Sequence, residues 1–142
     1  MSPNQIFSIV NAVAAGCWLM LAVLPRRRWV SHAVAGVAVP ALLAGIYTII
    51  IGVNFWSAEG GFSSLGGVAL LFSNPWLLLA GWIHYLAFDL LIGSWEARDA
   101  VERGISHMVV LPCLILTFLF GPAGWLVYLA VRSMPVNRRL PA

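Results

Sequence analysis

The sequence predicts an all-α integral membrane protein, a four-transmembrane-helix bundle with a short interfacial or re-entrant helix between the second and third spans. Hydrophobic residues make up 61% of the 142 residues, and charged residues only 9%. A soluble domain with so few charges could not cover its own surface. No alternating strand pattern appears, so each long apolar run is interpreted as a helix that satisfies its own backbone in lipid. The length fits a single membrane domain over residues 1–142.

Four apolar runs reach or approach the roughly 20 residues that a helix needs to cross a bilayer. They cover residues 6–24, 34–53, 76–93 and 108–131. Pro25 ends the first run, Pro40 should kink the second, and Asn74 with Pro75 should begin the third. In the fourth run, GPAG at 121–124 predicts a kink, and a re-entrant pair of short helices is the alternative.

The segment between the second and third runs is too long for a tight turn and too rich in glycine for a span. Within it, SLGGVALLF at 64–72 has the composition of a short apolar helix. We expect this helix to lie at the membrane interface or to fold back into the bundle.

The net charge of +3 comes entirely from arginine, because the chain contains no lysine. The arginines lie in short clusters beside apolar runs, which indicates contacts with membrane lipid and no nucleic-acid binding. Arginines concentrate in the first and third loops, so these loops are predicted to be cytoplasmic and both termini to lie outside. The arginines of the C-terminal segment oppose this assignment: Arg132, Arg138 and Arg139.

The third run is unusual because HYLAFDLLIGSWEARD at 84–99 places ionisable residues within a membrane-length apolar helix. At about 100° per residue, one side of this helix should carry four of them: His84, Asp89, Glu96 and Asp99. Such residues are costly in lipid, so they usually face the bundle interior and serve a site. Asp89, well inside the run, is the hardest to explain by headgroup solvation or by a purely structural hydrogen bond. For the others, headgroup solvation or a structural hydrogen bond is the alternative.

The ionisable residues of the third run could serve any of three functions. A buried carboxyl and a histidine could share general acid and base work on an apolar substrate. A metal site could form from His32 and His107, which should lie at the same membrane face as Glu96, together with Asp89. No ExxH or HxxxH spacing supports such a site, so we expect no metal. The polar groups could also join helices in a binding or assembly subunit.

Three segments resemble the ABA4-like family of small membrane proteins. They are GGFSSL at 60–65, GWIHYLAFDLLIGSWEARDA at 81–100 and GISHMVVLPCLILTFLFGPAGWLVYLAVR at 104–132. The resemblance is strong over 60–132 and weaker over the first two runs. Plant members of that family are required to make neoxanthin, an allenic carotenoid, from violaxanthin, an epoxy-carotenoid. The resemblance therefore implies carotenoid isomerisation, or assistance to it, inside a membrane.

Opening an epoxide to an allenic alcohol needs an acid and a base but no net oxidation. The resemblance thus predicts a cofactor-independent isomerase of a carotenoid or related polyisoprenoid. Asp89, kept protonated by its apolar surroundings, would be the acid and His84 the base. The candidate catalytic residues are His84, Asp89, Glu96 and His107. The candidate substrate-binding residues are Trp82, Tyr85, Phe88, Trp95 and Asn11.

A rival interpretation is a non-catalytic pigment-binding or assembly subunit of a membrane complex. The chain begins almost at the first span, without the transit peptide of the plant proteins, so it resembles a bacterial member of the family. We expect a multi-pass protein of the bacterial inner membrane whose partners are lipid and an apolar polyene. Assembly as a homo-oligomer or within a larger membrane complex is left open.

Overall fold

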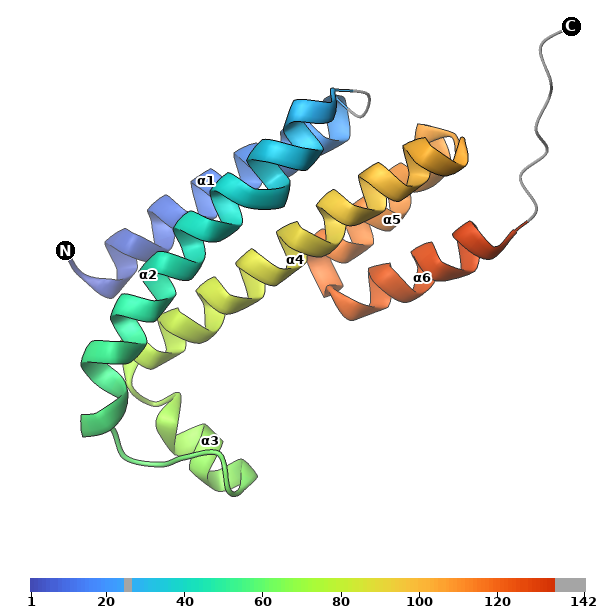
Figure 1. Ribbon diagram of the computed structural model, residues 1–142. Helices are drawn as coiled ribbons and strands as arrows, with labels where there is room; N and C mark the ends of the chain where they lie inside the picture. The colour runs from blue at the N-terminus through green and yellow to red at the C-terminus, as the bar shows by residue number, and fades with distance from the viewer. Residues whose placement is uncertain (25–26, 135–142) are drawn as a thin grey trace, which may run out of the picture.

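The computed structural model describes residues 1–24 and 27–134, and every regular element in these ranges is helical. The elements are α1 (Pro3–Val23), a π-helix η1 (Val30–Ala38), α2 (Val39–Asn54), a 3-10 turn η2 (Phe55–Ser57), α3 (Leu65–Leu71), α4 (Pro75–Arg103), α5 (His107–Phe120) and α6 (Pro122–Ser133). α1, α2 and α4 run side by side, whereas α5 and α6 fold back against the second half of α4 (Figure 1). The predicted all-α class is confirmed.

Three helical stretches are long and apolar enough to cross a membrane: Pro3–Val23, Val30–Ser57 and Pro75–Arg103. They correspond to the first three predicted spans, and the first stretch ends one residue before the predicted bound at residue 24. α4 is the most buried of them and packs against α1, α2, α5 and α6, so it is the central helix of the bundle. Its 29 residues extend about 44 Å, more than the hydrocarbon thickness of a bilayer. One end of α4 therefore reaches the headgroup layer.

The second span contains an irregular stretch before Pro40. η1 is a π-helix, and it passes directly into α2, in which Pro40 is the second residue. A proline ring clashes with the preceding turn and cannot donate a backbone hydrogen bond, so a widened turn on its N-terminal side relieves the crowding. The irregularity predicted at Pro40 is thus present as a π-helical segment.

The single kinked helix predicted over 108–131 is wrong, whereas a membrane crossing by this segment stays a prediction. The chain forms two helices, α5 of 14 residues and α6 of 12, which pack against each other. Each is shorter than the roughly 20 residues of a span. Gly121, between them, has φ +47° and ψ −101°, a conformation that favours glycine, and Pro122 cannot continue the hydrogen bonds of α5. The structure thus contains the two short helices of the alternative, and their re-entrant position in the membrane stays a prediction.

α3 is the short helix predicted between the second and third spans. Its seven residues begin after Ser64, whose hydroxyl accepts a hydrogen bond from the Gly67 amide at 3.0 Å. Most of its side chains are exposed, and only Leu71 is buried. The position of α3 relative to the membrane stays a prediction.

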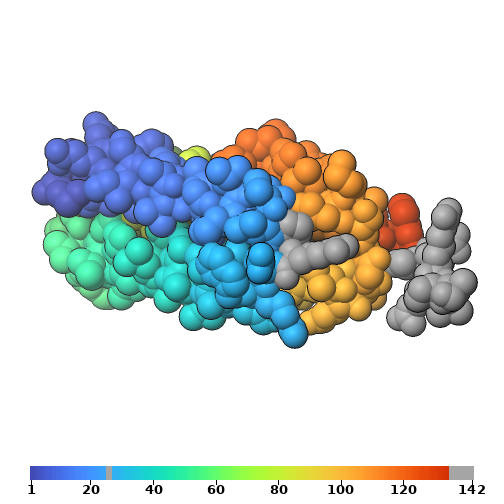
Figure 2. All heavy atoms as spheres, turned by 90° about the horizontal axis from the view of Figure 1, so that it is seen from above, coloured from blue at the N-terminus to red at the C-terminus, as the bar shows by residue number. Residues whose placement is uncertain are grey.

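The described arginines gather at one end of the molecule: Arg27, Arg28, Arg98, Arg103 and Arg132. In Figure 2 the residues that follow the first loop lie beside the turn between α4 and α5. Arg132 opposed the predicted orientation, and the reversal at Gly121 brings it back to Asp99, 2.8 Å away, at the same end of the bundle as the other described arginines. Arg26, Arg138 and Arg139 lie outside the described residues.

This arrangement predicts that the two termini lie on opposite sides of the membrane, with the C-terminus at the arginine-rich, cytoplasmic face. In a bacterial host, a C-terminal green fluorescent protein fusion should fluoresce, and a C-terminal alkaline phosphatase fusion should be inactive. A phosphatase fusion at the N-terminus should be active. An active phosphatase at the C-terminus would mean that α5 and α6 together cross the bilayer.

Candidate functional site

Three carboxyl groups lie on the buried face of α4 that meets α5 and α6. Asp89, Glu96 and Asp99 are exposed by only 8%, 0% and 9%. Asp89 and Glu96 are seven residues apart, two helical turns, and Glu96 and Asp99 are three apart, so all three fall on one side of the helix. The sequence periodicity therefore places these acids inside the protein, but their surroundings differ.

Glu96 is enclosed and touches one hydroxyl. The Thr117 side chain of α5 donates to its carboxyl oxygens, at 2.9 Å to Oε1 and 3.2 Å to Oε2. Within the described part of the chain, no arginine or histidine forms an ion pair with Glu96. A fully buried carboxyl without a cation is costly as a carboxylate, so this group suits a proton carrier.

Asp89 is enclosed at the turn between α5 and α6. Its Oδ2 is buried and has no hydrogen-bond partner among the described residues. The backbone of Gly121 lies against the carboxyl, and a Cβ atom at that position would be 2.9 Å from Oδ1. One turn before Asp89, the Tyr85 hydroxyl donates to the Phe118 carbonyl at 3.1 Å. An orphaned buried oxygen of this kind indicates a function or a missing partner.

Asp99 has the opposite character, because donors surround it. Tyr128 donates to Oδ2 at 2.7 Å, and Arg132 donates to both oxygens at 2.9 and 2.8 Å. Arg103 completes the set at 3.0 and 2.9 Å. The Arg132 guanidinium lies 5.3 Å from the centre of the Trp95 ring, which also meets Tyr128 edge-on. We call Asp99, Arg103, Tyr128, Arg132 and Trp95 the Asp99 clasp. These contacts hold the end of α6 against α4.

His84 does not join Asp89. Its side chain is exposed and lies between the rings of Tyr47 and Phe88, at centroid distances of 5.8 and 4.6 Å. This surface of α4 faces α2 and the outside of the bundle. The expectation that His84 and Asp89 share one inward-facing side of this helix was therefore wrong.

The other predicted substrate-binding residues fall in two places. Trp82 donates to the Asn11 side chain at 2.9 Å and packs against Tyr85 at 5.3 Å, joining α4 to α1. Phe88 is exposed beside His84, and Trp95 belongs to the Asp99 clasp. Only Tyr85 approaches the buried carboxyl of Asp89.

His107 lies at the arginine-rich end. Its Nε2 donates to the Ala22 carbonyl at 2.7 Å, and its ring borders a hollow of about 640 Å³ between η1, the end of α4 and the start of α5. The four predicted catalytic residues thus do not form one centre, since Asp89 and Glu96 share the α5–α6 side and the two histidines lie elsewhere. Nor do three metal-ligating side chains converge within residues 1–24 and 27–134.

Several residues of the site were missed by the sequence analysis: Thr117, Gly121, Tyr128 and Arg132 as a partner of Asp99. All of them lie in α5 and α6 or at their junction. A sequence signal for them was the GPAG interruption, because a reversal there lets residues that follow it return to α4.

A small helical membrane protein with buried, unpaired carboxyls beneath a helical hairpin is the class that this fold and site define. The chain matches the sequence model of the ABA4-like family, described as ABA DEFICIENT 4-like, over residues 5–128. It therefore belongs to the ABA4-like family. No curated protein and no solved structure matches it significantly.

Proposed function

We propose that this protein is a membrane-embedded, cofactor-independent isomerase of a carotenoid or related polyisoprenoid, with Asp89 and Glu96 as its reacting acids. The observation that carries the proposal is the burial of two carboxyls on one face of α4, neither of which has a cationic partner within residues 1–24 and 27–134. Purely structural buried acids are normally paired, as Asp99 is here. Membership in the ABA4-like family supports carotenoid chemistry.

In the proposed reaction, protonated Asp89 donates its proton to the epoxide oxygen of an end ring while the C–O bond breaks. The oxygen becomes a hydroxyl. Glu96, as a carboxylate, removes the proton from the neighbouring vinylic carbon, and the C–H electron pair forms the second double bond of an allene. One proton enters the substrate and one leaves, so the product is an isomer. Transfer of a proton from Glu96 to Asp89 restores the starting state.

His84, first assigned as the base, lies on the opposite side of α4, so Glu96 takes that role in the proposal. The polyene chain of the substrate has an apolar groove to bind beside the site. An apolar groove of about 240 Å³ runs between α1 and α5 and ends at Phe118, whose carbonyl binds Tyr85. Because both carboxyls are enclosed, the ring would reach them when α5 and α6 move away from α4.

The test is conversion of a 5,6-epoxy-carotenoid in a host that makes it, followed by chromatography of the pigments. Asp89→Asn and Glu96→Gln keep size and shape but cannot transfer the proton. Each should lower conversion about 100-fold or more, the usual contribution of a general acid or base. The matched control is Glu102→Gln, an exposed acid of the same helix, which should leave conversion unchanged. Normal conversion by both site variants at equal protein levels would refute the proposal.

The rival function, a pigment-binding or assembly subunit, is favoured by one observation. Three hollows on the described surface are lined by residues other than Asp89 and Glu96. Extraction of the lipophilic compounds that co-purify with the protein separates the two functions. A stoichiometric pigment without turnover supports the subunit, whereas product that accumulates on expression supports the enzyme.

A further inference from the structure

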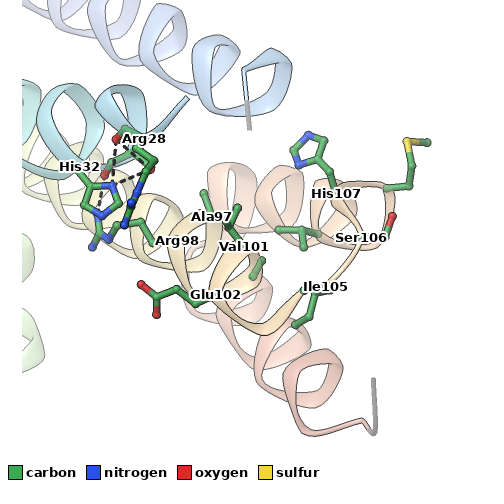
Figure 3. Close-up of a pocket in the computed structure, with 14 residues that line it drawn as sticks. Arg28, His32, Ala97, Arg98, Val101, Glu102, Ile105, Ser106 and His107 are labelled. Atoms are coloured by element: carbon green, nitrogen blue, oxygen red, sulfur yellow. Dashed lines mark hydrogen bonds between the residues drawn. The ribbon is translucent and has the colours of Figure 1, made fainter. Parts of the chain in front are cut away.

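A hollow of about 640 Å³ opens at the arginine-rich end of the bundle, away from Asp89 and Glu96 (Figure 3). Its ionisable lining is Arg28, His32, Arg98, Glu102 and His107. In Figure 3, Arg28, His32 and Arg98 lie together on one side, and Ser106 and His107 on the other. Alanine, valine and isoleucine side chains form much of the remaining wall. The hollow therefore combines a cationic side with apolar walls.

Arg98 is held in a fixed position at this hollow. Its Nη1 donates to the Ser31 carbonyl of η1 and to the Ser94 hydroxyl, 3.2 Å away. Gly36 leaves the space that the guanidinium occupies, since a Cβ atom there would lie 2.7 Å from Nη1. The other guanidinium nitrogens have no acceptor within the described residues. A positioned arginine with unused donors suits a bidentate oxyanion.

The charges around the hollow are not balanced by the protein. Among the described residues, Arg28, Arg98 and Glu102 form no ion pair, whereas the arginines of the Asp99 clasp are fully paired. The lining of the hollow therefore carries two guanidinium groups and one carboxylate. The start of α5 adds its positive dipole end here, and the Ser106 side chain does not cap it.

We propose that this hollow binds a phosphate ester through Arg28 and Arg98, and that the headgroup of an anionic phospholipid supplies it. The hollow lies where η1 begins and α4 ends, so it is at the headgroup level of the three helices that can cross the membrane. Its apolar walls suit the glycerol and upper acyl carbons that accompany a headgroup phosphate. A free phosphate would bind the same two arginines, but it has no apolar part to contact these walls.

Native mass spectrometry of the detergent-purified protein tests the site by titration with phosphatidylglycerol. Arg28→Gln and Arg98→Gln should each weaken binding about tenfold, the usual effect of losing a charged hydrogen bond. Arg27→Gln is the matched control, because it removes the same charge from the neighbouring position and Arg27 does not line the hollow. It should change the affinity less than twofold. Arg28 is exposed, so its variant should keep the fold even if the Arg98 variant does not.

Two parallel titrations identify the source of the phosphate. Phosphatidylcholine should bind at least tenfold more weakly than phosphatidylglycerol, and millimolar inorganic phosphate should not displace the bound lipid. Displacement by inorganic phosphate with the same dependence on Arg28 would assign the site to a free anion and overturn the lipid assignment. Equal affinities of the Arg27 and Arg28 variants, or no preference for the anionic lipid, would overturn the site itself.

Discussion

Replacing Gly124 by alanine should lower the stability of the protein by about 3 kcal/mol and separate α6 from α5, because it overpacks a close backbone contact. A Cβ atom at this position would overlap the backbone nitrogen of Thr117 and crowd the carbonyl carbon of Leu116. These are backbone atoms of α5, so no side chain can rotate away to make room. Only glycine, whose side chain is a single hydrogen atom, lets the two helices approach as closely as they do at residue 124.

The same substitution should disturb Glu96, because Thr117 is the residue that donates to its carboxyl. We expect the Gly124→Ala protein to lose pigment conversion as well as stability. The measurement is thermal unfolding in detergent, followed by tryptophan fluorescence, together with the conversion assay. Intact conversion combined with a large loss of stability would separate the hairpin from the proposed chemistry.

Gly45→Ala is the matched control for this prediction. Gly45 lies in α2, and an added Cβ there would meet nothing within 4 Å. Alanine favours a helix over glycine by about 1 kcal/mol, so this variant should be as stable as the parent or slightly more stable. Equal melting temperatures for the Gly124 and Gly45 variants would mean that α5 and α6 are not closely packed in the protein.

Helical periodicity predicted part of the site correctly and part of it wrongly, for the same reason. Asp89 and Glu96 are two turns apart, so a helix that buries one buries the other. His84 is five residues from Asp89, which corresponds to about 140° around the axis. That separation is wider than the stripe of α4 that α5 and α6 cover, so His84 faces outward. Placing all four ionisable residues on one side of the helix was therefore too coarse to predict which of them face the same neighbouring helices.

The hairpin could not be predicted from hydropathy, because one span and two short helices have the same apolar composition. The GPAG interruption predicted a break but not its angle. What distinguishes a kink from a reversal is a pair of contacts made by α6: Arg132 donates to Asp99, 33 residues earlier in the chain, and Gly124 lies against the backbone of Thr117. These contacts form only when α6 returns along α4. The orientation conflict among the arginines was a second sequence signal, beside GPAG, that pointed to the reversal.

Replacing Asp99 by alanine should cost about 3 kcal/mol, because it leaves the buried Tyr128 hydroxyl and the partly exposed Arg132 guanidinium without an acceptor. Tyr128 and Arg132 would both lose their partner, and neither has another acceptor among the described residues. We expect α6 to detach from α4. Hydrogen exchange of the α6 amides should then accelerate, while the amides of α1 and α2 keep their protection.

The two arginines of the Asp99 clasp should contribute unequally. Arg132 reaches Asp99 across the tertiary contact with a bidentate pair, and its side chain is 29% exposed. Arg103 lies four residues along the same helix, and its side chain is 44% exposed. Such an exposed pair within one helix usually contributes about 0.3–0.5 kcal/mol. A double-mutant cycle of Asp99→Asn with Arg132→Gln should therefore give a coupling energy several times that of the cycle with Arg103→Gln. If the two couplings were equal, the clasp would be a local feature of α4, and some other contact would hold the hairpin in place.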